Sequence, residues 1–401
     1  MSLPAHPHNA HLLDLRTPAD LAGELAAVGF PAREPLAEWE QVGHAVLRLE
    51  GVRPEVRSRL QALAVNPESP VRLYGSGPNL LLSANRRALR GLAKALSAGG
   101  LPAAGTELER CLDAAPGQWR WGRRTLDFRS GVKVMGVLNC TPDSFYPASR
   151  LPEPGPALEA ARAMIAAGAH ILDVGGESSR PGSDPVPAAE EIRRVVPVLE
   201  AIRRESDVLL SIDTRKPEVA QAALEAGADI LNDISALRAD RSPGDGTPGM
   251  AALAARRGAP LVLMHMRGEP KTMQAEPRYE DVVSEVLGEL SEAVEFAFAA
   301  GVERLIVDPG IGFGKRLADN LCLLKNLAVL RCLGCPVLVG LSRKSFLGAV
   351  TGAPVEDRLP ATIAAHTLAI LSGADIVRVH DVREAVQTVR LLLAVRGASC
   401  R

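Results

Sequence analysis

The stretch AGAHILDVGG (residues 167–176) contains the pattern that decides the fold of this chain. A glycine between two alanines marks the end of a helix, and a short apolar run follows it. The run ends at Asp173, directly before paired glycines. The same order of apolar run and polar ending recurs eight times in the C-terminal two thirds of the chain, with helix-like segments between the runs. Alternating strands and helices predict a parallel α/β fold, and eight such units are the number that closes a (β/α)8 TIM barrel.

The eight runs are rich in Val, Ile and Leu, as expected for strands covered on both faces. In such barrels the carboxyl ends of the strands line the mouth of the active site, so polar residues there are expected to converge on one cleft. The expected strands are KVMGVLN (133–139), HILDVG (170–175), VLLSID (208–213), DILNDI (229–234), PLVLMH (260–265), RLIVDPG (304–310), PVLVGLS (336–342) and DIVRVH (375–380). Their polar endings are Asn139, Asp173, Asp213, Asn232, His265, Asp308, Lys344 and the pair Arg378 and His380.

The composition sets the class of protein. The chain has 401 residues, 47% of them hydrophobic, and a net charge of −1, which allows one barrel of roughly 250 residues and a smaller module. The near-neutral charge gives no reason to expect nucleic acid or an anionic membrane as a partner. Six scattered cysteines do not make a disulfide framework, and neither a leader peptide nor an apolar run of about 18 residues is found. We therefore expect a soluble, cytoplasmic protein.

Two domains are predicted, a small N-terminal α/β module over residues 1–115 and a catalytic barrel over residues 116–401. In the module, AVLRLEG (45–51) and VRLYGSGPNLLLSA (71–84) are expected to form strands, and NRRALRGLAKALSA (85–98) an amphipathic helix. The module has no cluster of titratable residues that indicates a site. A packing or oligomerisation role is favoured for it, and the sequence does not specify this role further.

The barrel is preceded by GQWRWGRRTLDFRSG (117–131), two short strand-like stretches around a Gly-Arg-Arg turn. In barrels a hairpin at this place commonly plugs the closed bottom end and covers apolar side chains that water would otherwise reach. We expect a structural role for it.

Two loops after the first strands carry candidate binding groups. In NCTPDSF (139–145), Asn139 offers an amide oxygen to a cation or an amide nitrogen to a phosphate, although an ordinary turn is an equally good interpretation. In GGESSRPG (175–182), small residues let backbone amides approach an anion or a flat ligand. Arg180 in the same loop supplies a forked cation suited to carboxylate or diphosphate.

Three strand ends offer polar groups for a ring system. Asp213 and Asp308 contribute carboxylates and Asn232 an amide. Such a set, facing one cavity, suits a ligand rich in ring N–H and amino groups, such as the edge of a pteridine or purine. His265 also ends a strand, but a packing role is as well supported as ligand contact.

DPGIGFGK (308–315) is glycine-rich and ends in lysine, yet it is not a phosphate loop. The Walker spacing requires glycine where Pro309 stands and Ser or Thr where Arg316 stands. The dinucleotide fingerprint is also excluded, because it needs two residues between its last two glycines.

The last two strands end in cations. GLSRKSFLG (340–348) supplies Lys344 and Ser345, and RVHDV (378–382) supplies Arg378 and His380. Arg378 and His380 are two apart on a strand, so they project to the same side and can bind one anion together. Phosphate sites recur near strands seven and eight of this barrel. The alternative is a surface ion pair for Arg378 and a capping role for His380.

Taken in order, eight motifs resemble those of the dihydropteroate synthase family over about residues 117–395. The resemblance implies that 6-hydroxymethyl-7,8-dihydropterin diphosphate condenses with 4-aminobenzoate to give 7,8-dihydropteroate and diphosphate. It also implies a cytoplasmic homodimer that uses Mg2+. The motifs are NCTPDSF, GGESSRPG, SIDTRKPEVA, NDIS, MHMRGEPKTMQ, DPGIGFGK, GLSRKSFLG and RVHDV.

The resemblance also implies a role for each matched residue. Asn139 would bind Mg2+ on the diphosphate, and Arg378 with His380 would hold the departing anion. The pterin would be held by Ser179, Asp213, Asn232, Asp308 and Lys344, with Met264 packing on its ring. The aminobenzoate pocket would be shaped by Arg180, Phe313, Lys344 and Ser345. Since the amine attacks as a neutral nucleophile, catalysis is expected to be mainly electrostatic, with no Ser-His-Asp triad.

Two departures from the family pattern leave alternatives open. Tyr146-Pro147-Ala148-Ser149 replaces the usual Ser-Asp-Gly-Gly and removes an acidic residue from a loop, and Ser179 stands where Thr is usual. A catalytically silent pterin-binding paralogue is one alternative. A barrel that transfers a methyl group from methyltetrahydrofolate to a corrinoid protein is another, although methyl transfer does not need the cationic residues of SRKSF and RVHDV.

Overall fold

The computed structural model describes residues 10–13, 44–49, 52–64, 71–75, 80–102, 104–105, 108, 117–140, 155–178, 183–241 and 249–397. The chain divides into two compact units. One contains residues 1–116 with 328–335, and the other contains residues 117–327 with 336–401.

The first unit contains a small antiparallel sheet with strand order β1-β2-β4-β3. Leu80, Leu81 and Leu82 of the central strand β4 are almost completely buried, as is Leu89 of helix α3. The strands and the amphipathic helix predicted between residues 45 and 98 are confirmed. The elements are β1 (Ala10–Leu13), β2 (His44–Leu49), α2 (Pro54–Ala64), β3 (Arg72–Tyr74), β4 (Leu80–Asn85) and α3 (Arg86–Ala98).

The second unit is the predicted barrel. Eight parallel strands pair in the order β12-β11-β10-β9-β8-β7-β14-β13. The ring closes between its two end strands, where Val337 bridges Val307 and the Val307 amide donates to the Pro336 carbonyl at 2.9 Å. The TIM-barrel prediction is therefore confirmed. The strands are β7 (Lys133–Asn139), β8 (Ile171–Gly175), β9 (Leu209–Asp213), β10 (Ile230–Asp233), β11 (Leu261–Met264), β12 (Leu305–Asp308), β13 (Leu338–Gly340) and β14 (Ile376–Val379).

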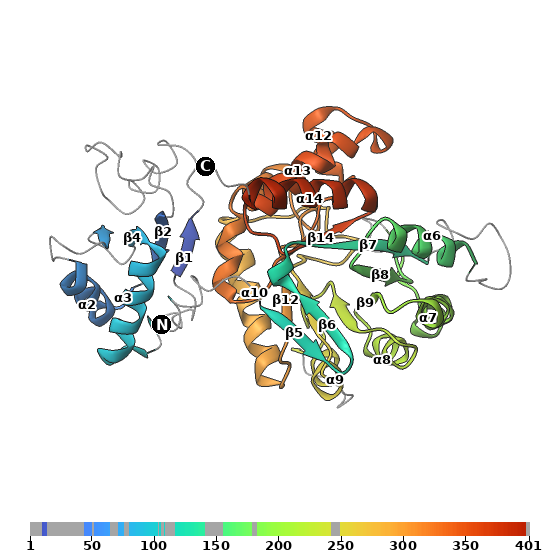
Figure 1. Cartoon of the computed structure of the whole chain (residues 1–401), viewed down its shortest axis with the longest axis horizontal. Helices are drawn as coiled ribbons and strands as arrows, with labels where there is room; N and C mark the ends of the chain where they lie inside the picture. The colour runs from blue at the N-terminus through green and yellow to red at the C-terminus, as the bar shows by residue number, and fades with distance from the viewer. Residues whose placement is uncertain are drawn as a thin grey trace. The chain divides into compact units, whose positions relative to one another are not determined.

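Helices follow the strands in sequence and lie outside the ring, as Figure 1 shows for α6, α7 and α8 beside β7, β8 and β9. Strand β13 departs from the one-helix pattern, because α12, a short 3-10 turn and α13 all follow it. The helices are α6 (Gly155–Ala166), α7 (Ala188–Glu205), α8 (Pro217–Glu225), α9 (Met250–Arg257), α10 (Val282–Ala299), α11 (Leu317–Lys325), α12 (Ser345–Thr351), α13 (Leu359–Leu371) and α14 (Val382–Gly397). None of the described helices is long and apolar enough to cross a membrane.

A hairpin closes the amino-terminal end of the barrel, as the sequence predicts. Its strands are β5 (Gln118–Trp121) and β6 (Arg124–Asp127). Leu126 and Phe128 share one buried cluster with a residue near the start of each barrel strand. Arg124 ties the hairpin to the barrel through a 2.7 Å ion pair with Asp229, the residue before β10. This end is filled and cross-linked, so ligand chemistry belongs at the opposite end.

The strand register brings predicted site residues to one level at the carboxyl end. Asn139 pairs with Gly175, Gly175 with Asp213, and Asp213 with Asn232. Asp308 pairs with Met264 in the same way. Residues that are scattered along the sequence therefore meet at one mouth.

Candidate active site

Arg378 of β14 is the centre of the polar site. Its Nε donates to Asp173 Oδ2 at 2.6 Å, and its Nη2 donates to Asp213 Oδ2 at 2.8 Å. Asn232 joins the same group, because its Nδ2 donates to Asp173 Oδ2 at 3.1 Å. Four strands thus contribute to one buried hydrogen-bonded cluster, and two of the three guanidinium nitrogens of Arg378 are fixed. Its Nη1 makes no hydrogen bond to any other described residue.

Two carboxylates share this single cation, which unbalances the charge. Asp173 is completely buried, and its Oδ1 has no hydrogen-bond partner among the described residues. Burial raises the pKa of Asp213 to about 7, with Arg378 opposing the shift and Asp173 adding to it. Burial would lower the pKa of Arg378, but its two carboxylate partners outweigh burial and raise it. The guanidinium therefore stays charged, whereas Asp213 can take up a proton near neutral pH.

Asp308 and Lys344 form the second half of the site. Asp308 Oδ1 accepts from the Gly310 amide at 2.7 Å, and burial raises its pKa against the opposing charge of Lys344. Lys344 Nζ donates to the Ile311 carbonyl and lies 4.3 Å from the centre of the Phe313 ring. Burial lowers the pKa of Lys344 to about 8, and Asp308 opposes this shift. The pair places a cation beside an aromatic face and a carboxylate.

The loop after β12 needs its glycines. Gly310, Gly312 and Gly314 all have positive φ, at 63°, 89° and 60°. A Cβ at Gly310 would lie 1.8 Å from the His265 carbonyl oxygen, and one at Gly314 would lie 2.1 Å from the Arg267 carbonyl oxygen. Backbone atoms cannot move aside as a flexible side chain can, so only glycine fits here. This explains the pattern that imitates a phosphate loop.

Gly310→Ala is expected to destabilise the protein by about 2 kcal/mol or more, because it adds a backbone clash to a left-handed conformation. Gly352→Ala is the matched control, since Gly352 has φ 73° but open space around its Cβ position. The control should cost only about 1 kcal/mol. Thermal unfolding of both variants measures the difference, and equal costs would show that the clash is relieved.

Lys315 supports this loop from behind. It is 3% exposed, and its Nζ lies 2.8 Å from His265 Nδ1 and donates to the carbonyls of Gly310 and Phe313 at 3.0 and 3.1 Å. Burial lowers the pKa of Lys315 to about 7 and that of His265 to about 4. His265 is therefore neutral, and its buried ring contacts Lys315. This favours a packing role for His265 over ligand contact. From the sequence, Lys315 was considered only as the end of a rejected phosphate-loop pattern and was given no role, although a lysine after three spaced glycines was a usable signal.

An apolar wall lies next to the polar groups. Met264 packs with Ile234, Met266 and Met273, and Phe313 packs against this cluster. Met264 also pairs with Asp308 in the strand register. A flat ligand held by Asp308 can therefore contact polarisable methionine sulfur on one side.

The loop at the end of β8 is held by a carboxylate network. Glu177 accepts from the Val186 amide at 3.1 Å and from Lys216 Nζ. Lys216 also donates to the buried Glu191 at 2.6 Å. A lysine on the loop after β9 therefore fixes the start of the loop that carries Ser179 and Arg180. Those two residues lie outside the described residues.

The remaining predicted site residues lie at the ends of β7, β13 and β14. Asn139 ends β7 and is half-buried. Ser345 is exposed at the first position of α12, directly after Lys344. His380 is exposed, and its Nδ1 lies 3.1 Å from Ser342 Oγ. The altered stretch Tyr146-Pro147-Ala148-Ser149 lies outside the described residues.

The structure thus brings most of the predicted site residues together, either in direct contact or through one intervening residue. Asp213 touches Arg378, Lys344 touches Phe313, and Asn232 reaches Arg378 through Asp173. Asp173 was noted as a strand end but was given no role by the sequence analysis. Its inward orientation between Asn232 and Arg378 makes it part of the site.

Comparisons with known proteins show the family to which this chain is similar. A family model described as pterin binding enzyme matches residues 135–380. Dihydropteroate synthase from Synechocystis sp. is 42% identical over 288 residues, 71% of this chain and 97% of its own length. The Escherichia coli dihydropteroate synthase is 44% identical over 267 residues, 66% of this chain and 92% of its own length.

A longer relative is a probable bifunctional folylpolyglutamate synthase/dihydropteroate synthase from Haloferax volcanii. It is 50% identical over 277 residues, which are 69% of this chain but only 32% of that protein. This chain therefore spans about a third of its length.

Solved structures of dihydropteroate synthases are also similar to this chain. Yersinia pestis dihydropteroate synthase in a sulfonamide drug complex superposes with a TM-score of 0.64 at 41% identity, over 70% of this chain and 100% of that chain. Thermus thermophilus dihydropteroate synthase in complex with 4-aminobenzoate gives 0.60 at 46% identity, over 68% and 97%. The Thermus thermophilus enzyme in complex with 6HMPPP gives 0.58 at 44% identity, over the same shares.

The barrel, its polar mouth and the family match place this chain among the pterin-binding enzymes, which are built on a TIM barrel. Within that class, relatives at 42–44% identity over nearly their whole length narrow the assignment. The chain belongs to the dihydropteroate synthase family of transferases.

Proposed function

We propose that this chain condenses 6-hydroxymethyl-7,8-dihydropterin diphosphate with 4-aminobenzoate to form 7,8-dihydropteroate and diphosphate. The observation that carries this assignment is that two groups of polar side chains lie together at the carboxyl end of the barrel. One group is the buried cluster of Asp173, Asp213, Asn232 and Arg378. The other group is Asp308 with Lys344 beside Phe313.

The pterin fits the polar groups of the barrel interior. A pterin presents ring N–H, amino and carbonyl groups on its edge, and Asp213, Asn232 and Asp308 supply acceptors and a donor for them. Met264 supplies an apolar contact for the ring face. Ser179 would add a hydroxyl, and Lys344 a cationic donor.

The aminobenzoate is assigned to the rim between β12 and β13. Phe313 offers a flat surface beside Lys344 Nζ, and Ser345 lies exposed at the start of α12. A carboxylate held by Ser345 and Arg180 would point the amine toward the pterin methylene. The amine is already a neutral nucleophile, so the geometry needs no general base.

The chemistry is a displacement at the pterin methylene carbon. The C–O bond to diphosphate breaks, the C–N bond to the arylamine forms, and the amine gives up a proton to solvent or to the leaving diphosphate. Negative charge grows on diphosphate as the bond breaks, so cations at the end of β14 lower the barrier. Arg378, with its plane fixed by Asp173 and Asp213, would contact that anion through Nη1, together with His380.

We also propose that Mg2+ accompanies the diphosphate and that Asn139 is its protein ligand. The Asn139 side chain makes no hydrogen bond to another described residue, so its amide oxygen is available. Mg2+ is usually held by one or two protein oxygens together with substrate phosphates and water, which fits a single amide. When bound, the ion would neutralise charge on the leaving group. Tighter diphosphate binding in the presence of Mg2+, lost in Asn139→Ala, is the test.

A homodimer is proposed from the outer surface of the barrel. Apolar side chains are exposed on α11, α13 and α14, including Leu321, Leu368, Leu371 and Leu391. Exposed apolar residues on neighbouring helices commonly mark a protein interface. Sedimentation of the whole chain tests this, and a monomer at micromolar concentration would refute it.

We place the protein in the cytoplasm, since Cys140 and Cys322 are free thiols, and cell fractionation tests this assignment.

The activity is tested with purified protein, the pterin diphosphate, 4-aminobenzoate and Mg2+. Formation of dihydropteroate together with an equal amount of diphosphate is expected. Binding of the pterin without turnover would instead indicate a silent paralogue. Methyl transfer to a corrinoid protein without pteroate formation would indicate the methyltransferase alternative.

The pH dependence of kcat/KM for the pterin diphosphate is expected to be bell-shaped. Asp213 must be ionised to accept from the pterin, and its pKa is raised to about 7, so activity should rise as the pH increases through that value. Lys344 must be protonated, and its pKa is lowered to about 8, so activity should fall above it. Rates measured between about pH 5.5 and pH 9.5 test this. A profile in which neither limb moves in Asp213→Asn or Lys344→Arg would contradict the assignment.

A further inference from the structure

Arg343, the residue between Ser342 and Lys344, forms hydrogen bonds with all of its guanidinium nitrogens on the side away from the site. Arg343 forms a two-point ion pair with Asp381, with Nε to Oδ2 and Nη2 to Oδ1 both at 2.9 Å. Its Nη1 donates to the carbonyls of Val355 and Glu356 at 3.1 and 2.9 Å. Every nitrogen of the guanidinium is therefore held.

The backbone of Arg343 is fixed as well. Its φ is +55°, a left-handed conformation that costs a non-glycine residue energy. The amide donates to Thr362 Oγ1 at 3.0 Å, and the carbonyl accepts from Arg358 at 3.1 Å. A strained residue persists only when its surroundings determine it, and here the contacts come from five residues: Val355, Glu356, Arg358, Thr362 and Asp381.

The ion pair joins the two segments that carry the candidate catalytic cations. Arg343 precedes Lys344, and Asp381 follows His380. On the inner side, Ser342 Oγ lies 3.1 Å from His380 Nδ1 and accepts from the His380 amide at 3.2 Å. The ends of β13 and β14 are thus cross-linked twice, once beside the site and once outside it.

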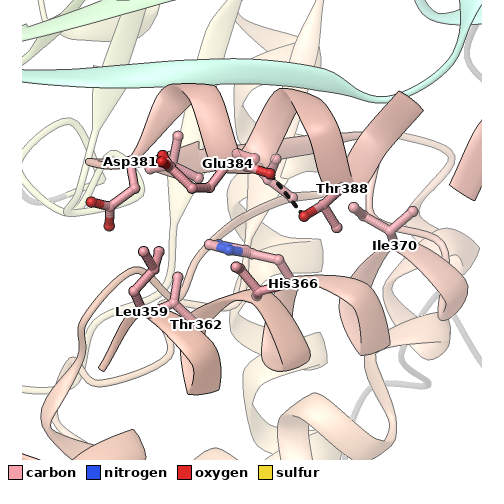
Figure 2. A pocket seen from close by; sticks show the side chains of 11 residues that line it. Leu359, Thr362, His366, Ile370, Asp381, Glu384 and Thr388 are labelled. Carbon is pink, nitrogen blue, oxygen red and sulfur yellow. Dashed lines mark hydrogen bonds between the residues drawn. The ribbon is translucent and has the colours of Figure 1, made fainter. Parts of the chain in front are cut away.

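The outer cross-link lies over a gap between two helices. Figure 2 shows Thr362 and His366 on α13 facing Asp381 and Glu384 at the start of α14 across a small pocket. His366 Nε2 is buried there and has no hydrogen-bond partner in the part of the chain that the structure describes. The pocket leaves α13 and α14 incompletely packed here, and Asp381, the partner of Arg343, is one of the residues that line it.

We propose that Arg343 and Asp381 are a pair of positioning residues that set Lys344 and His380 for the transfer reaction without touching either substrate. The inference rests on the proposed synthase activity. It assigns a role to the fourth residue of GLSRKSFLG and to the fourth residue of RVHDV, neither of which was given one from the sequence. Misplacement of a catalytic group by about 1 Å can cost on the order of 100-fold in rate, so a remote ion pair can control the site.

The test uses Arg343→Gln, Asp381→Asn and the double variant in the whole chain. The value of kcat/KM for 4-aminobenzoate should fall at least about tenfold in each single variant. The Kd of the pterin diphosphate should rise by less than the about tenfold expected for Lys344→Ala, because Lys344 and His380 are displaced but not removed, and Asp213, Asn232 and Asp308 are not attached to the pair. The double variant should be no worse than the poorer single variant, since both remove one interaction. Exchanging the charges, Arg343→Asp with Asp381→Arg, should recover part of the loss.

Arg162→Gln is the matched control. Arg162 makes a comparable two-point pair with Glu205, at 2.8 and 2.7 Å, between the outer helices α6 and α7. It should leave kcat/KM unchanged. Variants of Arg343 and Asp381 that are folded at the assay temperature and within twofold of wild type would overturn the positioning role, as would an equal loss in the control.

Hydrogen exchange keeps this test separate from the proposed function. Residues 341–346 and 379–382 should exchange faster in both single variants but not in Arg162→Gln, and this readout needs no turnover. An inactive wild-type protein would refute the synthase assignment. Unchanged exchange in these segments would refute the positioning pair, whatever the activity of the wild type.

Discussion

Arg378→Ala is expected to reduce kcat/KM by at least about 1,000-fold. Breaking a buried ion pair from one side costs roughly 3–5 kcal/mol, because the partner charge is left uncompensated. Here two carboxylates lose their shared cation, at 2.6 and 2.8 Å, and the proposed leaving-group contact is lost with it. The synthase assay with saturating Mg2+ measures the loss.

The same variant should have a distinct pH dependence of stability. Arg378 opposes the raised pKa of Asp213, so its removal raises that pKa further above the unfolded value. The folded state then binds more protons than the unfolded state, and its free energy of unfolding must fall as the pH rises. Thermal unfolding at about pH 5 and about pH 8 tests this sign.

Two comparisons complete the Arg378 experiment. Arg378→Lys keeps the positive charge but loses the planar guanidinium that donates to two carboxylates at once, so it should recover only part of the activity. Arg162→Ala removes an arginine from an outer ion pair and should leave activity intact. Near-normal turnover in folded Arg378→Ala would show that the chemistry lies elsewhere.

The barrel could be predicted because its signals are local. Each strand is a short apolar run with a polar ending, and glycines mark the helix ends before several of them. Gly168, Gly227 and Gly373 do have positive φ just before β8, β10 and β14. The convergence of Asp213, Asn232 and Arg378 then follows from the barrel geometry alone.

The contacts within the site could not be predicted in the same way. Which of two neighbouring charges points inward depends on register and packing, which the sequence does not display. Asp173 is buried between Asn232 and Arg378, and Lys315 is buried behind its own loop. Two adjacent cations, Arg343 and Lys344, separate into an outer ion pair and a site residue.

The helical layer shows a similar limit. Helix-like segments between the strands were predicted without their number, and β13 is followed by both α12 and α13. The extra helix supplies Thr362, whose hydroxyl accepts from the strained Arg343 amide. The second helix between β13 and β14 therefore contributes to the geometry of the barrel mouth.

Lys344→Ala is expected to lower kcat/KM by about 100- to 1,000-fold, the range for removing a donor that stabilises developing charge. Lys344 interacts electrostatically with Asp308 and lies 4.3 Å from the centre of the Phe313 ring, so its loss affects both proposed subsites. The Kd of the pterin diphosphate should rise at least about tenfold, since a hydrogen bond to a charged group contributes roughly 1.5–3 kcal/mol. Turnover and calorimetric binding measure the two effects.

A shift in pH dependence distinguishes loss of this cation from general damage. Lys344 opposes the raised pKa of Asp308, so without it that pKa rises further. Pterin binding by Lys344→Ala should therefore require a higher pH than binding by the wild type, and the alkaline limb assigned to Lys344 should disappear. Lys94→Ala, which removes an exposed lysine from α3, serves as the control and should change neither quantity. If the alkaline limb persists in Lys344→Ala, a different group carries the proton, and the role assigned to Lys344 is wrong.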